Sequence, residues 1–439
     1  MTASEREVYA ARRERVQRLL GEDGVLVLAA GPQLVAGRDN ELRYRPDADL
    51  RYLTGYTEPE AVLVLAPGAD APFTLFVRDR DPERELWTGR RGGVEAALER
   101  FGADQAFPVA ELASRLPGLL AGRAAIHARL TGGRPEVDAV MRETVERARS
   151  TRQRSGRGAR TFADPGLLLD ELRLFKDEGE LVLMREAARI SVESFRECAA
   201  AIRDGAGEWE VQAALEYGFR RLGGDGPAFE SIVASGDNAT VLHYVSNDRC
   251  MHAGELLLVD AGAGWQGYAA DITRTFPVSG AFTAGQRDLY DGVLAAHDAA
   301  IAAVRPGAPA DAVHRAALRA LVVALVDHGL LHGVVDELVE QEQSYAPFFP
   351  HKTSHWLGLD VHDVGEYARA GASRPLQPGM VLTVEPGLYI PASALDAPAS
   401  LRGMGIRIED DILVTAGGNE VLTGALPASA REVESLVAG

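Results

Sequence analysis

The segment from residue 255 to residue 277 constrains the fold more than any other part of the chain. An apolar run ends in Asp260, a Gly-rich turn follows, and a second strand-forming run begins at Asp271. We predict a hairpin with its midpoint between Trp265 and Gln266, which puts the two aspartates opposite each other with Cβ atoms about 4.5–5.5 Å apart. Like charges at that distance repel unless a cation lies between them. The pair is therefore either two metal ligands or, as the alternative, turn and surface aspartates.

A second stretch gathers histidines. His351, His355 and His362 lie within twelve residues, whereas the whole chain has 10 histidines. The stretch is otherwise apolar and contains glycine, which predicts that it is half buried. Because buried imidazoles usually bind a metal ion or a carboxylate, we interpret the cluster as part of a site rather than as chance clustering at the surface.

Two further strands place an acid among apolar residues. Glu385 ends an apolar run directly before a Pro-Gly turn, where a strand gives way to a cleft. Glu409 follows Ile408, and strand geometry puts it on the same face as Arg407. A buried acid needs a partner, so Glu409 is predicted to bind either a metal ion or Arg407 alone.

Together the four stretches supply one imidazole and four carboxylates. The five candidate ligands are Asp260, Asp271, His355, Glu385 and Glu409. This oxygen-rich set favours a hard or borderline divalent ion such as Mn²⁺ over a structural thiolate zinc site. Four negative charges exceed what one ion needs, whereas two ions about 3.5–4 Å apart, bridged by carboxylates and a hydroxide, would use them all. The H-E-x-x-H, phosphate-loop and G-x-S-x-G patterns are absent from the sequence.

The first part of the chain predicts an α/β domain over residues 1–165. Short apolar runs between turn residues favour strands, and segments with helical periodicity favour helices. We expect strands at 24–30, 61–66 and 73–77, and helices at 7–20, 94–100 and 135–149.

Six arginines and no acid lie between residues 147 and 160. A basic stretch of this kind is either a nucleic-acid patch or a solvated linker. We favour a linker between two domains, because the stretch has no interleaved aromatic residues and the whole chain is acidic.

The remainder, residues 166–439, predicts a second, α+β domain. Both of its halves give two helices followed by strands, which suggests a duplicated unit. We expect helices at 177–204, 208–222, 284–304 and 311–328, and strand-like runs at 380–389 and 406–414.

Composition limits the partners and the compartment. The 64 Asp and Glu residues outnumber the 46 Lys and Arg residues, which gives a formal net charge of −18 and argues against nucleic acid or an anionic membrane as a partner. The longest apolar run, 320–326, is far shorter than the roughly 20 residues that span a bilayer. Two cysteines are too few for a disulfide framework, so we expect a soluble protein of the reducing cytoplasm.

Taken in order, these motifs resemble aminopeptidase P, a member of the pita-bread metallopeptidases. The resemblance rests on Asp260-Ala-Gly, Asp271-Ile-Thr-Arg-Thr-Phe-Pro, Ser354-His-Trp-Leu-Gly-Leu-Asp-Val-His-Asp, Thr383-Val-Glu-Pro-Gly-Leu-Tyr and Gly405-Ile-Arg-Ile-Glu-Asp-Asp. It extends to Arg38-Asp-Asn-Glu, Tyr52-Leu-Thr-Gly-Tyr and Glu58-Pro-Glu-Ala-Val-Leu-Val-Leu, and so covers nearly the whole chain. It implies an α/β N-terminal domain and an α+β pita-bread (creatinase/aminopeptidase-like) catalytic domain.

The resemblance also implies a metal arrangement with two divalent ions, most simply Mn²⁺. Asp260 and Asp271 would hold one ion, and Asp271 would also bridge. His355 and Glu385 would complete the second ion, with Glu409 bridging both.

Further roles follow from the same resemblance. Substrate-binding side chains are implied at His243, His351, His362 and, as a weaker candidate, Tyr389; catalytic roles are implied at His243, His362, Glu385 and Arg407. His362 would steady the scissile carbonyl, Glu385 would carry a proton to the leaving nitrogen, and Arg407 would support the metal carboxylates.

The implied activity is metal-dependent release of the N-terminal residue from peptides with proline in the second position, by a hydroxide that bridges the two ions. A prolidase, which cleaves X-Pro dipeptides, is the alternative; a metal-free interaction protein or a creatinase-like hydrolase is a more distant one. Homo-oligomers, dimers or tetramers, are common in the family. Two features depart from its pattern: Lys352 stands where a small residue is usual, and residues 333–349 match less closely.

Overall fold

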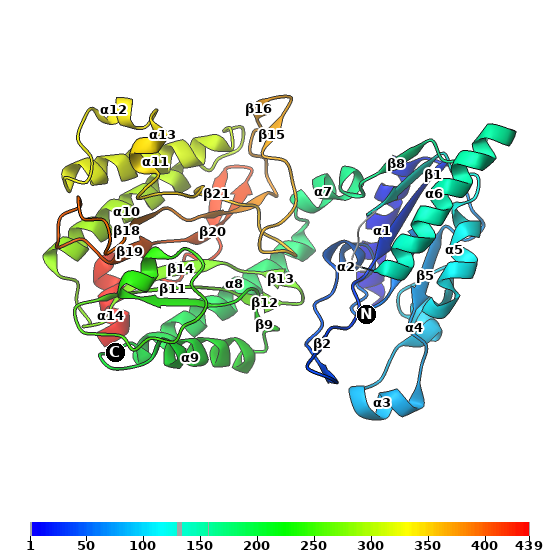
Figure 1. The fold of residues 1–439 in the computed structure, drawn as a ribbon, viewed down its shortest axis with the longest axis horizontal. Helices are drawn as coiled ribbons and strands as arrows, with labels where there is room; N and C mark the ends of the chain where they lie inside the picture. The colour runs from blue at the N-terminus through cyan, green and yellow to red at the C-terminus, as the bar shows by residue number, and fades with distance from the viewer. Residues whose placement is uncertain (1, 130–133, 157, 439) are drawn as a thin grey trace. The chain divides into compact units, whose positions relative to one another are not determined.

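The computed structural model describes residues 2–129, 134–156 and 158–438. The chain divides into two compact units, Met1–Arg173 and Leu174–Gly439 (Figure 1). The sequence places the domain boundary between residues 165 and 166, and that position stays a prediction. α7 (Gly166–Leu174) follows it, and the division between the compact units falls at the end of this helix.

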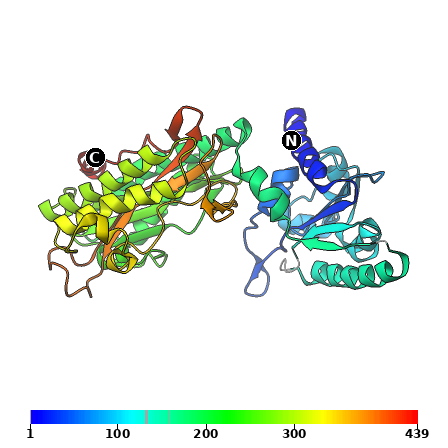
Figure 2. The same ribbon diagram turned by 90° about the horizontal axis from the view of Figure 1, so that it is seen from above.

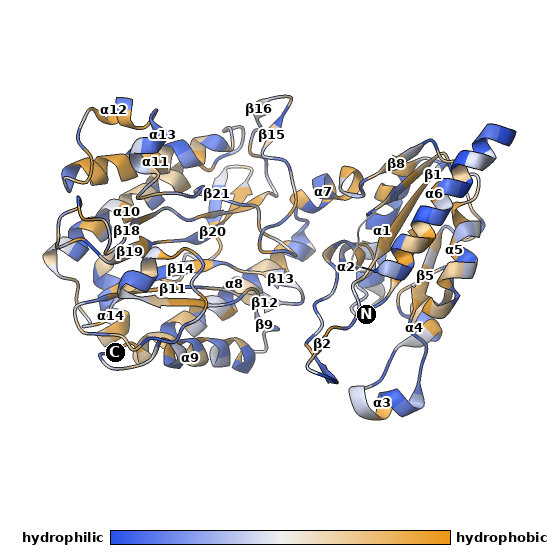
Figure 3. Ribbon diagram, viewed as in Figure 1, coloured by the Kyte–Doolittle hydropathy of each residue, from blue (hydrophilic) through white to orange (hydrophobic). Residues whose placement is uncertain are grey.

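The N-terminal unit is built on a mixed six-stranded sheet of order β6-β5-β4-β1-β7-β8. The strands of this sheet are β1 (Gly24–Ala29), β4 (Val62–Leu65), β5 (Phe73–Val77), β6 (Gln105–Pro108), β7 (Ala125–Ala128) and β8 (Thr161–Ala163). Outside this sheet, β2 (Val35–Ala36) pairs with β3 (Asn40–Glu41). The unit's helices before α7 are α1 (Ala3–Leu20), α2 (Ala48–Thr54), α3 (Pro82–Thr88), α4 (Gly93–Glu99), α5 (Leu112–Leu120) and α6 (Pro135–Ser155). The predicted α/β class and the expected strands and helices are confirmed. The hydrophobic colour of β1 and β5 in Figure 3 marks the buried sheet.

The predicted linker at 147–160 is wrong over its first part. Residues 147–155 are the last turns of α6, which are hydrophilic in Figure 3. After Pro135 no proline or glycine interrupts this helix until Gly156, which ends it in the left-handed region at φ 70°. Glu143 pairs with Arg147 one turn later and supports the same helix. An arginine-rich composition therefore describes a solvated helix surface here.

The C-terminal unit repeats the order of two helices followed by strands. Its helices are α8 (Glu178–Cys198), α9 (Glu208–Arg221), α10 (Ala284–Ala303), α11 (Asp311–Asp327), α12 (Val335–Leu338), α13 (Glu342–Tyr345) and α14 (Ala430–Ala438). Its strands are β9 (Gly226–Pro227), β10 (Ile232–Ser235), β11 (Leu256–Ala261), β12 (Ala263–Trp265), β13 (Tyr268–Ala269), β14 (Ile272–Pro277), β15 (Ala368–Arg369), β16 (Ala372–Ser373), β17 (Val381–Val384), β18 (Gly387–Ile390), β19 (Met404–Arg407), β20 (Asp410–Thr415) and β21 (Gly418–Val421). This is the α+β arrangement that the sequence predicts.

One hydrophobic core joins both helix pairs to the strands that carry the candidate aspartates. Phe195 of α8 and Phe219 of α9 are fully buried in it, as are Leu289 of α10 and Leu321 of α11. They pack with β11 and β14, while α10 and α11 run side by side (Figures 1 and 2). The core therefore holds β11 and β14 in a fixed position within this unit.

The hairpin of β11 and β14 forms, but its turn lies one residue later than predicted. Trp265 pairs with Tyr268, so the turn residues are Gln266 and Gly267, with φ of 45° and 83°. Positive φ at both positions is the signature of a type I′ turn, in which glycine suits the second position. The shift moves each cross-strand partner by two residues, so Asp260 lies opposite Thr273, and the predicted opposition of Asp260 to Asp271 is wrong.

The two aspartates nevertheless stay on one face, because a displacement of two residues preserves the side-chain alternation of a strand. Continuing the observed register places Asp271 opposite Gly262. A Cβ atom on Gly262 would lie 1.6 Å from the Ala270 carbonyl oxygen, so only glycine allows the strands to approach this closely.

A second antiparallel ladder is interrupted where the candidate glutamates lie. β17 pairs with β20 and β18 with β19, in one continuous register that places Glu385 opposite Glu409. Pro386 has no N–H for this ladder. The Glu385 N–H instead donates to the Thr353 carbonyl at 2.8 Å, and the Glu409 N–H donates to the Thr273 carbonyl at 3.0 Å. Each predicted run, 380–389 and 406–414, is therefore two strands with a glutamate at the break.

Candidate metal centre

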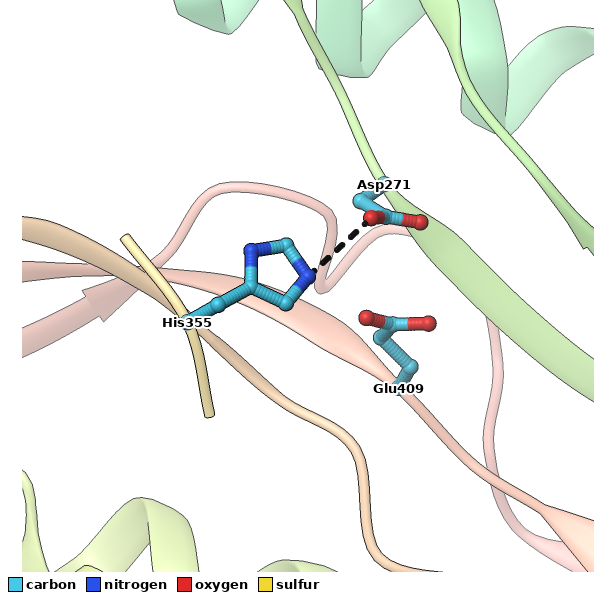
Figure 4. A group of neighbouring side chains, drawn as sticks. All are labelled: Asp271, His355 and Glu409. Atoms are coloured by element: carbon cyan, nitrogen blue, oxygen red, sulfur yellow. Dashed lines mark ion pairs between the residues drawn. The ribbon is translucent and has the colours of Figure 1, made fainter. Parts of the chain in front are cut away.

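Three of the five candidate ligands converge closely. Asp271, His355 and Glu409 each offer a ligand atom, and these three atoms lie within 4.8 Å of one another. His355 Nε2 is 3.5 Å from Asp271 Oδ2 (Figure 4), and the same nitrogen is 3.5 Å from Glu385 Oε1. Two ligand atoms that each lie about 2.1 Å from one ion are separated by roughly 3–4.2 Å. These spacings therefore suit a shared cation.

Asp260 completes the group from the opposite strand. Its Oδ2 accepts a hydrogen bond from Arg407 Nη2 at 2.6 Å, while its Oδ1 has no hydrogen-bond partner. Asp271 Oδ1 is equally buried and without a hydrogen-bond partner. With residue exposures of 8% and 5%, neither Asp260 nor Asp271 is a surface turn residue, which excludes the alternative left open by the sequence. Buried acceptors of this kind fit a divalent cation, which would satisfy them.

The protonation of the centre follows from its burial and crowding. Burial, then Glu409 and Asp260, raise the pKa of Asp271 well above its ordinary value. Burial, then Glu385 and Asp260, raise the pKa of Glu409 in the same way. Burial raises the pKa of Glu385 to about 8, with Asp260 adding to the shift. These carboxylates repel one another as anions, so the metal-free centre holds protons that a cation would displace.

His355 is presented as a neutral ligand. Burial lowers the pKa of His355 to about 4. The ring nitrogen Nδ1 lies 3.1 Å from the Trp356 carbonyl oxygen, which can only accept, so Nδ1 carries the proton. The lone pair of Nε2 therefore faces the carboxylates, in the tautomer that binds a metal ion.

Arg407 and Thr273 connect the two ladders behind the carboxylates. Arg407 donates from Nε to the Thr273 hydroxyl at 3.1 Å and from Nη1 to the Tyr389 hydroxyl at 2.8 Å. Thr273 in turn donates to Glu409 Oε2 at 2.6 Å, so Arg407 is linked to Glu409 through this hydroxyl. Thr273 is not among the site residues predicted from the sequence. Its signal is the alternation along β14, which puts residue 273 on the same face as Asp271.

Asp410 and Asp411, which follow Glu409, also escaped the sequence analysis. Asp411 Oδ2 accepts a hydrogen bond from the Asp271 N–H at 3.1 Å and so holds that backbone in place. Asp410 is paired with Arg274 at 3.0 Å. Burial raises the pKa of Asp410, but Arg274 and then His297 outweigh it, and the pKa falls to about 2. Arg274 also donates to the Glu409 carbonyl at 2.6 Å, which anchors the strand that carries Glu409.

The carboxylates line a cavity of about 540 Å³. His243, His351 and His362 line the same cavity, as does Lys352. His243 and His362 are exposed, and the His362 ring meets the His355 ring edge-on, with centroids 4.5 Å apart. The predicted substrate-binding histidines are thus brought together around one opening.

Tyr389 lies behind His351. It is only 3% exposed, and its hydroxyl lies 2.8 Å from His351 Nε2. His351 Nδ1 donates to the Lys352 carbonyl oxygen at 2.8 Å, so Nε2 must accept from the Tyr389 hydroxyl. Burial and then the neighbouring Arg407 lower the pKa of His351 to about 4, so the ring is neutral. Tyr389 holds the His351 ring in place from beneath.

A half-buried imidazole and four carboxylates from two antiparallel ladders and the adjoining histidine segment, open to one cavity, form the kind of site expected of a metal-dependent hydrolase of the pita-bread class. The chain belongs to metallopeptidase family M24, whose sequence model matches residues 182–416, and its N-terminal part matches the aminopeptidase P N-terminal domain over residues 9–127.

Individual relatives agree over the full length of the chain. The chain is 40% identical to Xaa-Pro aminopeptidase of Escherichia coli over 439 residues, covering 100% of this chain and 99% of the relative. Aminopeptidase PepP of Pseudomonas aeruginosa has a similar structure, with a TM-score of 0.94, 42% identity and coverage of 99% and 98%. Zinc-substituted E. coli aminopeptidase P in complex with product gives a TM-score of 0.92, 40% identity and coverage of 99% and 98%.

Proposed function

We propose that this protein is an Xaa-Pro aminopeptidase, which releases the N-terminal residue from peptides that carry proline in the second position. The observation that carries the proposal is the cluster of one imidazole and four carboxylates in a cavity that three further histidines also line. The 40% identity to an Xaa-Pro aminopeptidase over the whole chain supports the choice of substrate.

We assign the metal ligands as the resemblance to aminopeptidase P implies. Asp260 and Asp271 would hold one divalent ion, His355 and Glu385 would complete a second, and Asp271 and Glu409 would be shared between them. Mn²⁺ is our choice of ion because the ligand set is mostly carboxylate oxygen. When bound, the two ions supply a bridging hydroxide at neutral pH and polarise the scissile carbonyl.

The chain's own residues orient the substrate and move the proton. Glu385, which lines the cavity beside His355, would carry a proton from the attacking water to the leaving proline nitrogen. His362 and His243, both exposed in the cavity, donate N–H groups to the substrate carbonyl oxygen as negative charge develops there.

Arg407 fixes Asp260, and Tyr389 fixes the neutral His351 ring as a wall of the pocket. The X-Pro bond has no amide N–H, so the pocket wall does not have to supply a hydrogen-bond acceptor there. A pocket that fits the pyrrolidine ring can therefore select proline by shape.

The test is a comparison of two substrates with the metal-loaded protein. An X-Pro-Y tripeptide should be cleaved in Mn²⁺ much faster than an X-Pro dipeptide. Cleavage of the dipeptide alone would make the protein a prolidase. Metal analysis of the purified protein serves as the second arm, because turnover that persists at fewer than one ion per chain would indicate the metal-free class.

We further propose that the protein is a cytoplasmic homo-oligomer, a dimer or tetramer, assembled through the N-terminal unit. Leu86 and Trp87 on α3 are 82% and 85% exposed, and exposed apolar side chains of this size are typical of interfaces. Cys198 and Cys250 are unpaired, as suits a reducing compartment. Among the described residues no helix is long and apolar enough to cross a membrane. A monomer in analytical ultracentrifugation would contradict the assembly.

A further inference from the structure

Lysine is almost absent from this protein, and its two positions both belong to the catalytic unit. Of 46 Lys and Arg residues, only Lys176 and Lys352 are lysine. Lys176 is buried and binds Asp363 at 2.9 Å, directly beside His362, so it has a structural partner. Lys352 is exposed and lines the cavity of the metal centre. The proposed chemistry gives Lys352 no role.

The backbone that carries Lys352 is held on both sides. The Lys352 carbonyl accepts from His351 Nδ1 at 2.8 Å, and the His351 ring packs edge-on against Phe349, with centroids 4.8 Å apart. Thr353 is fully buried, and its carbonyl accepts the Glu385 N–H. His351 Nδ1 also lies 3.7 Å from Glu385 Oε2. Lys352 is therefore next in sequence to a residue that contacts the backbone of the candidate ligand Glu385, and consecutive Cα atoms are about 3.8 Å apart.

The ammonium group of Lys352 has no counter-charge of its own. No carboxylate in the described part of the chain forms an ion pair with it. The charge of Lys352 nevertheless acts on a partly buried group: burial and then Lys352 lower the pKa of His314, on α11, to about 4. His314 lies 2.9 Å from the Thr353 hydroxyl. The positive field of Lys352 therefore extends toward the segment that holds His351.

Metal binding would neutralise the ligand carboxylates of the cavity wall but not the charge of Lys352. Two divalent ions would neutralise the four ligand carboxylates, and Arg407 already binds Asp260. Of the charged side chains on the cavity wall, Lys352 and Glu230 are then the two that stay free of the centre. A flexible ammonium at such a wall attracts an anionic group of the substrate.

The geometry of a bound peptide indicates which anion this is. The scissile carbonyl belongs to the first residue and lies at the centre, so the third residue of the peptide lies two residues beyond it. An extended chain covers about 3.3–3.6 Å per residue, so a carboxylate on the third residue is roughly 7 Å from the centre. Lys352, which lines the cavity and adjoins a residue in contact with the Glu385 backbone, can reach a group at that distance.

We infer that Lys352 is a specificity-determining residue that binds a carboxylate on the residue after the proline, and so favours substrates that are anionic at the third position. The inference rests on the proposed function. Two sources supply this carboxylate: the free C-terminus of an X-Pro-Y tripeptide, and an acidic side chain at the third position of a longer peptide. Lys352 acts on binding, so its contribution appears in KM more than in kcat.

The test compares three peptides with the Mn²⁺-loaded protein: Ala-Pro-Ala, Ala-Pro-Ala amide and Ala-Pro-Glu amide. The wild-type protein should prefer the free acid over the neutral amide by roughly three- to tenfold in kcat/KM, through KM, as expected for a partly exposed ion pair. The glutamate arm shows whether an acidic side chain is recognised as well. Added salt should reduce the preference.

Lys352→Met should bring the acid-to-amide ratio close to one, and Lys352→Arg should retain most of the preference. Arg305→Met is the matched control, because this change also removes one positive charge. Arg305 is exposed and does not line the cavity. A wild-type ratio near one, or a preference that survives in Lys352→Met, would overturn the inference.

Failure of the proposed function gives a different result. If the wild-type protein cleaves none of the three peptides, the aminopeptidase proposal falls. Calorimetry with Pro-Ala and Pro-Ala amide then still decides the role of Lys352. Tighter binding of the acid in wild-type but not in Lys352→Met supports the role, and equal binding of the two dipeptides by both proteins overturns it.

Discussion

Each unit of this protein buries a group of carboxylates, and the two groups are neutralised differently. In the N-terminal unit Asp49, 2% exposed, binds Arg173 at 2.7 Å. Arg129 also pairs with Asp49 and binds Asp47 at 3.1 Å. In the catalytic unit the four candidate ligand carboxylates have one arginine among them, Arg407, which binds Asp260.

The difference lies in the balance of charge. Two arginines match the two aspartates of the N-terminal group. In the catalytic group, Arg407 alone cannot balance four carboxylates. Burying unpaired charge is costly, so these carboxylates must take up either protons or metal ions from solution. An excess of buried carboxylates over neighbouring arginines is therefore expected at a metal centre and not at a structural ion pair.

The largest effect is expected for Asp271→Ala. Removing this carboxylate should lower kcat/KM by a factor on the order of 10³ or more and weaken metal retention, because the centre loses a ligand. The same change should raise the thermal stability of the metal-free protein, since it removes a carboxyl group whose pKa is raised by burial and then by Glu409 and Asp260, and such a raised pKa costs the folded state stability at neutral pH. Kinetics, metal analysis and melting curves with and without EDTA measure the three effects. Wild-type turnover in this variant would refute the site assignment.

The matched change in the N-terminal unit is Asp49→Ala, which should act in the opposite direction on stability. It removes the buried carboxylate that pairs with Arg173, itself 2% exposed, and breaking a buried pair in this way costs about 3–5 kcal/mol. The loss should be the same with and without Mn²⁺, as followed by denaturant unfolding. If the loss of stability disappeared when the metal was removed, the proposed difference between the two carboxylate groups would be wrong.

A smaller effect is expected for Thr273→Val, which removes the hydroxyl that links Arg407 to Glu409. Partners of metal ligands typically contribute about 10–100-fold in metal affinity or activity, and we expect a loss in this range, measured by Mn²⁺ titration. Thr273→Ser keeps the hydroxyl and is the control. Equal affinities for the valine and serine variants would show that the link is unimportant.

The smallest effect is a dependence of metal stabilisation on pH. The folded, metal-free protein holds a proton on Glu385 up to a pKa of about 8, whereas 4.5 is the ordinary value. A raised pKa in the folded state means that the metal-free protein loses stability as the pH rises between these two values. Metal binding displaces the proton, so the rise in Tm on adding Mn²⁺ should be larger at pH 8 than at pH 6. An increase that is larger at pH 6 would contradict the crowded centre.

Local patterns predicted much of the fold. The apolar runs and helical periodicity predict both units, the two helix pairs of the catalytic unit, the strand that carries Asp260 and the strands on either side of Glu409. Acids within or at the ends of apolar runs, together with the histidine cluster, also identify the candidate ligands, whose individual roles stay predictions. These features depend on residues close in sequence, where burial and alternation leave a direct trace.

Other features depend on contacts that no local pattern records. Gln266 occupies the first position of a type I′ turn with φ of 45°, which a non-glycine residue rarely adopts, so the turn was placed one residue early. Arg173 and Asp49 are 124 residues apart, and nothing near either one indicates the pair. Thr273 has a role only because the corrected register sets it between Arg407 and Glu409. The arginines after residue 147 suggest a linker by composition, although no proline or glycine interrupts the helix there before Gly156.

The most direct test of the account is a titration of the EDTA-treated protein with Mn²⁺, followed by hydrolysis of an X-Pro-Y tripeptide. If two divalent ions neutralise the excess of buried carboxylates, activity should be absent at first, rise with added metal and level off at about two ions per chain. Full hydrolysis before any metal is added, or a protein that binds no Mn²⁺ at neutral pH, would contradict it.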